Sequence, residues 1–493
     1  MPGRTTATIT AYLVAGLVLA QNEEDALRIS TGQPGGTARS NGMANAFGAL
    51  GADPVSISIN PAGLALYRTS GLSLTSLLEV NNAATEHYGT SSAATQTRFA
   101  FNNVALILNT PSKEGSDWRS GTFGVVYDRK QSHHWSTIAG GNDVPSTILQ
   151  GFADEAEGVS YTTIEDDLPF SAGLAWSTFA LDTIQGSATS YEPFLFGPNT
   201  RQAHSIETNG ATTQTSFFYS GNYMDKLYLG MSIGMAGHRF RRTSTHTENN
   251  LDLGLDRMDR LTYKEDLTTS GNGFDVKVGA LVRITERLRA AASFHSPQWM
   301  QLNDAYAMEL QTTFRTPDNN GDYSYKAISP DGTFAYRVVT PWRTTASAAY
   351  LAGANGAISV DYEYADMRSM RFKPSNQLED LYDFEIENAA IQDRFRAVHT
   401  IRVGTEWRSG NWYYRAGWSM VPDAHKKGDA LHGQALKTYA AGIGYRSEHV
   451  TVDLGMNYAL QQSAFFQYAP YLVRATTEER ASYRTFLTIA LRP

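Results

Sequence analysis

Two neighbouring histidines in the first half of the chain are candidate metal-binding side chains. His133 and His134 precede Trp135 in a stretch that does not alternate like a strand. A histidine can bind haem iron, so haemin binding is one hypothesis for this pair. The alternative is an exposed dipeptide in the first very long loop, and the surrounding sequence favours that interpretation.

Other polar patterns give no complete catalytic or metal site. Residues 318–322 read Asp-Asn-Asn-Gly-Asp, which has the spacing of a calcium loop, but no glutamate closes it. The chain has no Gly-x-Ser-x-Gly elbow, phosphate loop or His-Glu-x-x-His helix. His295 and Ser296 are adjacent, and adjacent residues on a strand point to opposite faces. We therefore predict no enzymatic activity, no catalytic residue, no metal and no cofactor.

The composition excludes several classes of protein. The 493 residues include no cysteine, which excludes disulfides, thiolate metal sites and a lipid anchor on an N-terminal cysteine. A net charge of -8 argues against nucleic acid as a partner. Mean hydropathy is only -0.34, yet 11% of residues are aromatic. A membrane β-barrel combines these values, because only every second strand residue faces lipid.

The first twenty residues predict an export signal. Arg4 supplies a positive charge, and residues 9–20 form an apolar run that is too short for a spanning helix. Cleavage after Ala20 would leave Gln21 as the mature N-terminus. The alternative is a buried N-terminal helix.

Strict alternation of apolar and polar residues predicts that most of the chain is β-strand. In residues 227–235, Leu, Leu, Met, Ile and Met share one face, while Tyr, Gly, Ser and Gly share the other. Residues 274–284, 357–364 and 450–458 repeat this period of two. The pleat of a strand points successive side chains to opposite sides, which makes this pattern the signature of a wall with one polar face.

The connections predict a closed barrel of about fourteen antiparallel strands. Tight turns follow the even-numbered strands and long loops follow the odd-numbered ones, as outer-membrane barrels require. The long loops would face outside, and both termini would lie at the tight-turn end. We expect strands near 71–85, 95–109, 120–130, 202–219, 227–243, 263–284, 287–313, 333–351, 357–373, 398–408, 412–421, 436–446, 450–460 and 483–492.

The predicted inner face of the barrel is charged. A barrel of this size is too wide for side chains alone to fill, and residues 21–70, which are not strand-like, are the candidate plug. The charges would either be solvated or hold this plug in place. The predicted inward-facing residues are Asp275, Lys277, Arg283, Arg289, Asp361, Glu363, Arg402, Glu406, Arg415 and Asp453.

The second strand breaks its own period. Phe99 and Phe101 share one parity, whereas Val104 and the alternate residues after it continue on the other. One extra residue at Asn102-Asn103 would restore the phase, which predicts a β-bulge. The alternative is an error in the assumed register.

The region before the strands resembles a known family. Residues 35–40 (Gly-Gly-Thr-Ala-Arg-Ser), 42–53 (from Gly-Met-Ala to Gly-Ala-Asp) and 60–64 (Asn-Pro-Ala-Gly-Leu) are similar to the hatch of the outer-membrane long-chain fatty-acid and hydrocarbon transporters (FadL/TodX-like), in a Bacteroidetes-type version. Ser296-Pro297-Gln298-Trp299 and residues 340–343 also resemble the family. The last strand departs from the common barrel pattern, because it ends Leu491-Arg492-Pro493 without a terminal aromatic residue.

This resemblance implies an all-β, fourteen-stranded transmembrane barrel with the hatch inside its lumen. It divides the chain into a signal peptide (1–20), the hatch (21–70) and the barrel (71–493). It also implies uptake without an energy source: cargo binds beneath extracellular loops and leaves sideways through the wall. The family's kink is usually in the third strand, whereas the period break here is in the second. The predicted gating residues are Asn60, Pro61, Ala62, Asn102 and Asn103.

The function expected from these features is passive import of hydrophobic small molecules through the outer membrane of a Gram-negative cell. The partners would be a hydrophobic molecule or lipid and the bilayer, with no nucleic acid. Two alternatives remain open, a plugged-barrel subunit for protein secretion or surface attachment, and haemin binding. The first apolar site for cargo would be formed by loop residues Phe170, Leu174, Trp176, Phe179, Phe194 and Leu195, for which packing in a loop core is the alternative.

Overall fold

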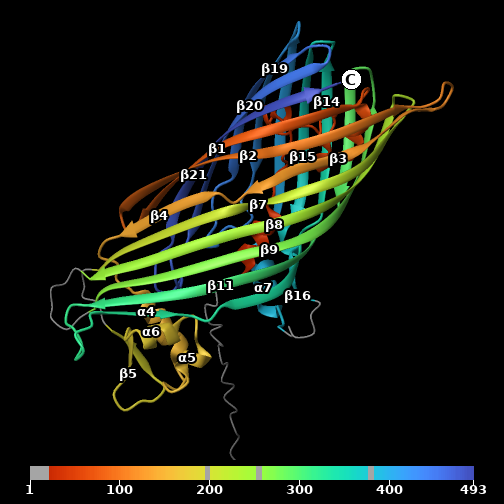
Figure 1. Cartoon of the computed structure of the whole chain (residues 1–493). Coiled ribbons are helices and arrows are strands. Elements are labelled where there is room, and N and C mark those ends of the chain that lie inside the picture. The colour runs from red at the N-terminus through yellow and green to blue at the C-terminus, as the bar shows by residue number, and fades with distance from the viewer. Residues whose placement is uncertain (1–21, 195–199, 251–257, 376–381, 493) are drawn as a thin grey trace, which may run out of the picture.

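The computed structural model describes residues 22–194, 200–250, 258–375 and 382–492, and most of them lie in one closed antiparallel barrel of fourteen strands (Figure 1). The alternation in the sequence therefore predicted the correct fold. The wall is built from β1 (Gly71–His87), β2 (Thr90–Pro111), β3 (Trp118–Ser132), β4 (Trp135–Gly141), β7 (Thr200–Tyr223), β8 (Leu227–Asn250), β9 (Met258–Arg283), β10 (Leu288–His295), β11 (Trp299–Phe314), β13 (Gly332–Val339), β14 (Arg343–Ala352), β15 (Gly356–Asp366), β16 (Arg371–Pro374), β17 (Ala397–Ser409), β18 (Trp412–Val421), β19 (Leu436–Arg446), β20 (Val450–Phe465) and β21 (Thr476–Leu491).

Four wall strands are each interrupted once. β3 continues into β4, β10 into β11, β13 into β14, and β15 into β16 through the short 3-10 helix η2 (Met367–Ser369). β9 pairs with both β10 and β11, which shows that these two segments form one strand. β1 pairs with β21 and closes the sheet. This ladder pairs the first wall strand with the last, so the sheet has no open end.

The predicted parity of the connections is confirmed, with two exceptions. Two to six residues follow each even-numbered wall strand, for example 353–355 after β14 and 447–449 after β19. Long loops follow the odd-numbered strands, except that only Tyr88 and Gly89 join β1 to β2 and only residues 251–257 join β8 to β9. The sequence prediction ended the first strand too early, because the polar residues of 86–94 were taken for a loop. In the structure they extend the hairpin.

The outer surface is apolar along the middle of the strands. On β8, Leu229, Met231, Ile233 and Met235 are exposed, while Tyr228 and its alternate neighbours are buried. Exposed aromatic side chains such as Trp407, Trp412 and Tyr445 lie close to the short turns, as in the aromatic girdle at a bilayer interface. A closed sheet with this exterior is an outer-membrane barrel that crosses the bilayer many times.

The described helices are four to ten residues long, and the 3-10 helices are three and six residues long. In the described part of the chain, no helix combines the length and the apolarity that a bilayer span needs. Helices α4 (Ile148–Ala156), α5 (Ile164–Asp167) and α6 (Ala172–Ser177) belong to one long loop, together with the small hairpin β5 (Leu181–Thr183) and β6 (Tyr191–Pro193). Helix α7 (Glu385–Arg394) follows β16, and β12 (Ser324–Ile328) pairs with β11 in another loop.

Residues 22–70, called the plug segment below, lie inside the barrel (Figure 1). They form α1 (Glu23–Ser30), α2 (Ala38–Asn41), α3 (Ser56–Ile59) and the 3-10 helix η1 (Pro61–Leu66). Asn22 begins α1 with a capping box, in which its side chain and that of Asp25 each accept a hydrogen bond from the other's backbone N–H. Asn60 caps η1, and Pro61 occupies its first position, where no N–H is needed.

The plug segment runs from the long-loop end toward the short-turn end. Helix α1 contacts α7, which lies in a long loop, whereas η1 packs against β7, β8 and β9. The expectation that both ends of the mature chain lie at the tight-turn end is therefore wrong for the first described residues. The polar face of α1 explains the difference, because its acidic first turn is paired with charged loop residues.

The predicted bulge in the second strand is confirmed. Along the β1–β2 ladder, Thr75 pairs with Asn103 and Ser76 pairs with Phe101, so that Asn102 is the extra residue. Asn102 and Asn103 are consecutive buried residues, and Phe99, Phe101 and Val104 all face outward. The bulge thus keeps the apolar side chains in contact with lipid while it turns two amides into the lumen.

Candidate functional site

A large cavity lies in the lumen between the plug segment and the long loops. Its volume is about 1090 Å³, which is ample for a lipid-sized molecule, since ligand pockets are typically about 300–1,000 Å³. Aromatic and apolar side chains form part of its lining, among them Trp135, Phe152, Phe240, Phe465 and Tyr468.

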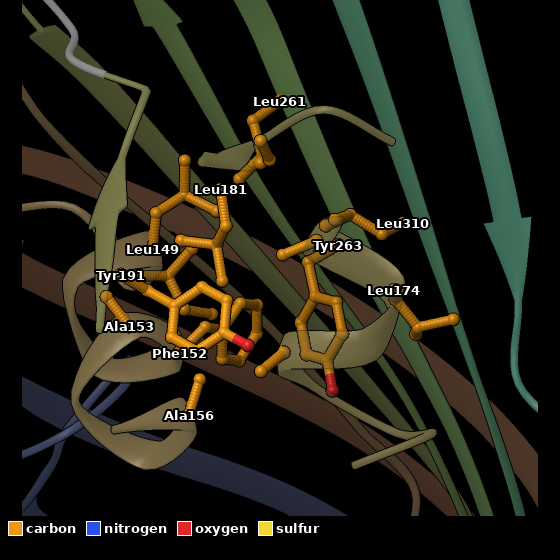
Figure 2. Packing of buried hydrophobic residues seen from close by; sticks show 14 of the residues in the cluster. Leu149, Phe152, Ala153, Ala156, Leu174, Leu181, Tyr191, Leu261, Tyr263 and Leu310 are labelled. Atoms are coloured by element: carbon orange, nitrogen blue, oxygen red, sulfur yellow. The ribbon is translucent and has the colours of Figure 1, made fainter. Parts of the chain in front are cut away.

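A folded loop lies at the long-loop end of the barrel (Figure 1), and its residues Ile148, Gly151 and Phe152 line the cavity. Residues 142–194 of this loop, called the lid, contain α4 to α6 and pack through Leu149, Phe152 and Leu174 against Tyr263 and Leu310 of the wall (Figure 2). Glu248 of β8 accepts hydrogen bonds from the Thr147 hydroxyl (2.6 Å) and the Ile148 N–H (2.9 Å). Because a carboxylate is favourable at a helix N-terminus, this contact fixes α4 over the cavity.

The six predicted ligand residues occupy the core of the lid more than the cavity wall. Leu174 is buried there, and Phe170, Trp176 and Phe194 pack against the same cluster. Phe179 is 59% exposed and contacts Tyr325, while Leu195 lies outside the described residues. None of the five described residues lines the cavity. Their role as a first binding site stays a prediction, and the structure favours the loop-core alternative.

The predicted gating residues Asn60, Pro61 and Ala62 anchor the plug segment to one side of the barrel. The Asn60 side-chain amide donates to the Ala280 carbonyl (3.2 Å), and the Ser220 hydroxyl donates to the Pro61 carbonyl (2.7 Å). This contact requires glycine in the wall, because a Cβ at Gly279 would lie 1.9 Å from the Asn60 side-chain oxygen. The Asn-Pro-Ala triplet is thus packed against β7 to β9, and it does not face the cavity.

Charges on the inner wall hold the plug segment from other sides. Arg39 forms a two-pronged ion pair with Glu406 (2.8 Å for both contacts), and Glu406 also pairs with Arg415 (2.6 Å). Asp361 accepts hydrogen bonds from the Gly48 N–H, and Arg289 donates to the Leu50 carbonyl. These lumen charges are thus paired with residues 22–70, and the hypothesis that they hold a plug stays a prediction.

A second set of contacts joins the plug segment to the bulge of β2; we call Gly36, Asn102, Asn103 and Asp128 the clasp. Asn102 donates to the Gly36 carbonyl (2.7 Å). One carboxylate oxygen of Asp128 accepts from the Gly36 N–H (3.0 Å) and the Asn103 amide (2.6 Å). The other accepts from the Ser58 hydroxyl (3.1 Å). Asn102 therefore holds the plug segment directly, whereas Asn103 acts through Asp128, which the sequence prediction missed.

Asp128 also marks the place where two wall strands separate. β2 and β3 pair from Pro111↔Ser120 to Asn103↔Asp128, and no β2–β3 pair is recorded among the described residues beyond this point. β2 stays paired with β1 as far as Thr90, while β3 and β4 follow β7. We call this unpaired boundary the seam. The run Asp-Arg-Lys at 128–130, inside an apolar strand, was the signal that could have indicated it.

Side chains bridge the seam where backbone pairing is missing. Arg98 of β2 donates to the Gly210 carbonyl of β7 (3.2 Å), and the His134 ring lies 3.4 Å from the Thr97 carbonyl. β4 passes over the inner face of β1, where Asn81 donates to the His134 carbonyl (2.6 Å). The wall is therefore weakest along β2 residues 90–102, since side-chain contacts are more easily rearranged than a ladder.

His133 and His134 are not in an exposed loop, contrary to the sequence interpretation. His133 is buried at the bend between β3 and β4, with Nε2 hydrogen-bonded to Thr212 (3.1 Å) and its ring against Phe240. Binding of haem iron would break that hydrogen bond and displace the ring. Residues 318–322 form a turn closed by Asp318, and no metal-binding group of three ligands occurs among the described residues.

An ionic cluster ties α1 to the long loops; we call Glu23, Glu24, Arg394, His425 and Asp429 the outer latch. Arg394 of α7 pairs with Glu23 and with Asp429 (2.8 Å). His425 pairs with Glu24 (2.9 Å) and with Asp423 (3.0 Å). Burial lowers the pKa of His425, but these two carboxylates outweigh it and raise the pKa to about 9.

We expect alkaline pH to release α1 from this latch. The folded pKa of His425 lies above its ordinary 6.5, so its contribution is complete below pH 6.5 and is lost as the pH rises through about 9. A nitroxide label on T31C, placed just after α1 in this cysteine-free chain, should become more mobile between pH 7 and pH 10. In H425Q the label should be mobile already at pH 7. An unchanged spectrum of the wild-type background would contradict the prediction.

Comparison with known proteins identifies the fold. No protein-family model matches the chain, and no curated protein matches its sequence. A solved FadL homologue from Pseudomonas aeruginosa aligns with a TM-score of 0.54 and 12% identity, over 93% of this chain and 98% of the other. The toluene transporter TodX from P. putida aligns with a TM-score of 0.50 and 11% identity, over 93% and 99%. The Bacteroidetes-type assignment stays a prediction, and this chain has the outer-membrane FadL fold.

Proposed function

We propose that this protein is a passive importer of hydrophobic small molecules. The observation that carries the proposal is a lumen cavity of about 1090 Å³ whose boundary includes the lid residue Phe152, the plug residue Gly35 and Arg129 beside the seam. The similar fold of a toluene transporter supports this class of cargo. In this proposal residues 1–20 direct export, residues 21–70 act as the hatch, and residues 71–493 form the barrel.

Cargo would enter beneath the lid and leave through the seam. Transfer of apolar surface from water into the cavity is favourable by roughly 25 cal/mol per Å², so no energy source is required. From the cavity, the path through the plug segment is blocked by the Arg39–Glu406 ion pair and by the close packing at Asn60. Beyond Asp128 the described residues of β2 and β3 share no backbone ladder. The seam would therefore open when side-chain contacts break, among them those of Arg98, His134 and Asn81. Lateral exit into the bilayer is therefore the easier route.

Cross-linking the seam tests this route. Cysteines introduced by R98C and N209C would be the only ones in the chain, and a bis-maleimide should join β2 to β7. We expect liposomes or cells with the cross-linked barrel to lose accelerated uptake of a radiolabelled hydrophobic cargo. A reducible linker should restore uptake on reduction.

The matched control places both cysteines across a paired boundary. E86C and S91C face each other on β1 and β2 at the long-loop end, and the same linker there should leave uptake unchanged. Uptake that persists with the seam cross-linked would refute lateral exit. Absence of accelerated uptake even in the uncrosslinked barrel would refute the proposed function itself.

A further inference from the structure

Two buried histidines face each other at the end of the cavity where the lid is attached to the wall. His204 of β7 and His246 of β8 are paired across the sheet, and both line the cavity. They are 5% and 1% exposed, and their Nδ1 atoms lie 3.4 Å apart. Two imidazole nitrogens this close either share a proton in a hydrogen bond or bind the same metal ion.

The distance between these nitrogens fits a tetrahedral metal ion. Zinc binds imidazole nitrogen at about 2.0–2.1 Å, so two nitrogens 3.4 Å apart subtend an angle of about 110° at the ion. A square-planar copper(II) site, with an angle of about 90°, would bring them to about 2.9 Å. Hydrogen bonds donated by N–H groups usually measure about 2.7–3.2 Å. The separation is therefore long for a shared proton and right for Zn²⁺.

The other nitrogen of each ring has a partner on the wall. His246 Nε2 lies 3.0 Å from the Glu248 carboxylate, and His204 Nε2 lies 3.3 Å from the Ser244 hydroxyl. When both Nε2 atoms carry the proton, each ring donates to its partner and both Nδ1 lone pairs can bind one ion. Histidines that bind metals almost always donate their other N–H in this way, because it fixes the orientation of the ring.

The charge around Glu248 favours a cation at this place. Glu248 is fully buried, and it accepts hydrogen bonds from the Gln202 amide, the Thr147 hydroxyl and the Ile148 N–H. Among the described residues, its single ion-pair partner is His246. A buried carboxylate is costly unless a positive charge compensates it. A zinc ion bound to the far side of the His246 ring would supply that charge.

The cavity can supply the remaining coordination positions. Among the described residues, no group of three side chains is placed to hold a metal, so water or another ligand in the cavity would complete the tetrahedron. His87 of β1 is buried, its Nε2 atom has no hydrogen-bond partner, and it acts electrostatically on His204 and His246. His87 is therefore the candidate for a third ligand.

We propose that His204 and His246 bind one Zn²⁺ ion beneath the lid, with Glu248 holding the His246 ring in place. The proposal goes beyond the sequence prediction, which named no metal, and it does not depend on the proposed function. The ion would polarise the His246 N–H and strengthen its bond to Glu248. Because Glu248 also binds the first residues of α4, zinc should tighten the attachment of the lid.

Calorimetric titration of ZnCl₂ into the full-length barrel tests the site. The protein is kept in nanodiscs, without a histidine tag and after treatment with a chelator. We expect one Zn²⁺ ion to bind per chain. H204Q and H246Q should each lose this binding. S244A should weaken it by about ten- to a hundredfold, which is the range for losing a group that orients a metal ligand.

Two spectroscopic measurements identify the ligands without a variant. Cobalt(II) in the same site should show the strong visible absorption of a tetrahedral ion, and X-ray absorption at the zinc edge should show at least two imidazole nitrogens. Hydrogen exchange of the α4 amides should slow when zinc binds to the wild type, but not in H246Q. Unchanged exchange in the zinc-bound wild type would overturn the link to the lid.

A matched control separates this site from the outer latch. H425Q removes a histidine that lies between two carboxylates, and it should bind zinc as the wild type does. Loss of binding in H425Q alone would place the ion at the outer latch and overturn the proposal. A wild type that binds no zinc, or equal binding by H204Q and H246Q, would also overturn it. If these two variants fail to fold, a zinc-edge spectrum with fewer than two imidazole ligands would refute the site.

Discussion

Replacing Glu406 with alanine should free the plug segment from the inner wall at a cost of about 3–5 kcal/mol, the usual effect of breaking a buried ion pair by removing one partner. Glu406 is 9% exposed and binds both Arg39 and Arg415. In E406A, Arg415 keeps its ion pair with Asp453 at 2.8 Å, whereas Arg39 is left with the longer-range attraction of Asp53 and Asp453. The stabilisation that is lost belongs mainly to Arg39, which also donates a hydrogen bond to the Ala52 carbonyl (2.8 Å).

Hydrogen exchange of the amides in α2 measures this effect directly, since it reports the free energy of local opening. The double variant R39M/E406M should recover part of the loss, because it removes both charges together. E286A is the matched control, since Glu286 lies in an exposed turn, and it should change stability by less than about 0.5 kcal/mol. Unchanged protection of α2 in E406A would show that the ion pair does not hold the plug segment.

Replacing Asp128 with alanine should have the second large effect. We expect it to appear as ion conductance through the barrel. The substitution leaves the Gly36 N–H, the Asn103 amide and the Ser58 hydroxyl without their acceptor. Each buried donor left unsatisfied costs about 1–3 kcal/mol. The Gln33 N–H, which donates to the Lys130 carbonyl next to the seam, would be the main remaining tie of this stretch to β3.

Single-channel recordings in planar bilayers test this expectation. D128A should show frequent conducting openings, whereas the wild type should stay closed most of the time. N102A is the graded control, because it removes only the donor to the Gly36 carbonyl, and its openings should be rarer. If D128A were as closed as the wild type, the clasp would not be the contact that keeps the seam and the plug segment together.

The strands could be predicted because their constraint is local. Each wall residue faces either lipid or lumen. The alternation at 227–235 therefore identifies a strand and its two faces from nine residues alone. The bulge at Asn102 was predictable for the same reason, since a change of parity is visible in one strand. The end of β1 was not predictable, because hairpin residues beyond the membrane have no lipid face and lose the apolar half of the pattern.

The site was harder to predict because it depends on pairs that are distant in sequence. The tie between Asp128 and Gly36 has no local signature, and neither does the ion pair between Arg39 and Glu406. Phe170 and Trp176 look like ligand residues because they are apolar and lie in a loop, but a lid of this size needs a core of its own.

The pairing of β1 with β21 has a consequence for how the molecule is made. These strands lie at opposite ends of the barrel sequence, and their ladder closes the wall around the plug segment. Contacts between such distant segments form late, since loop closure costs entropy before the contact is gained. Either the Arg39, Asn60 and Gly36 contacts form while the sheet is still open, or the plug segment enters the barrel after it has closed. In the first case, β1 and β21 would pair around a plug segment that is already bound to the other strands.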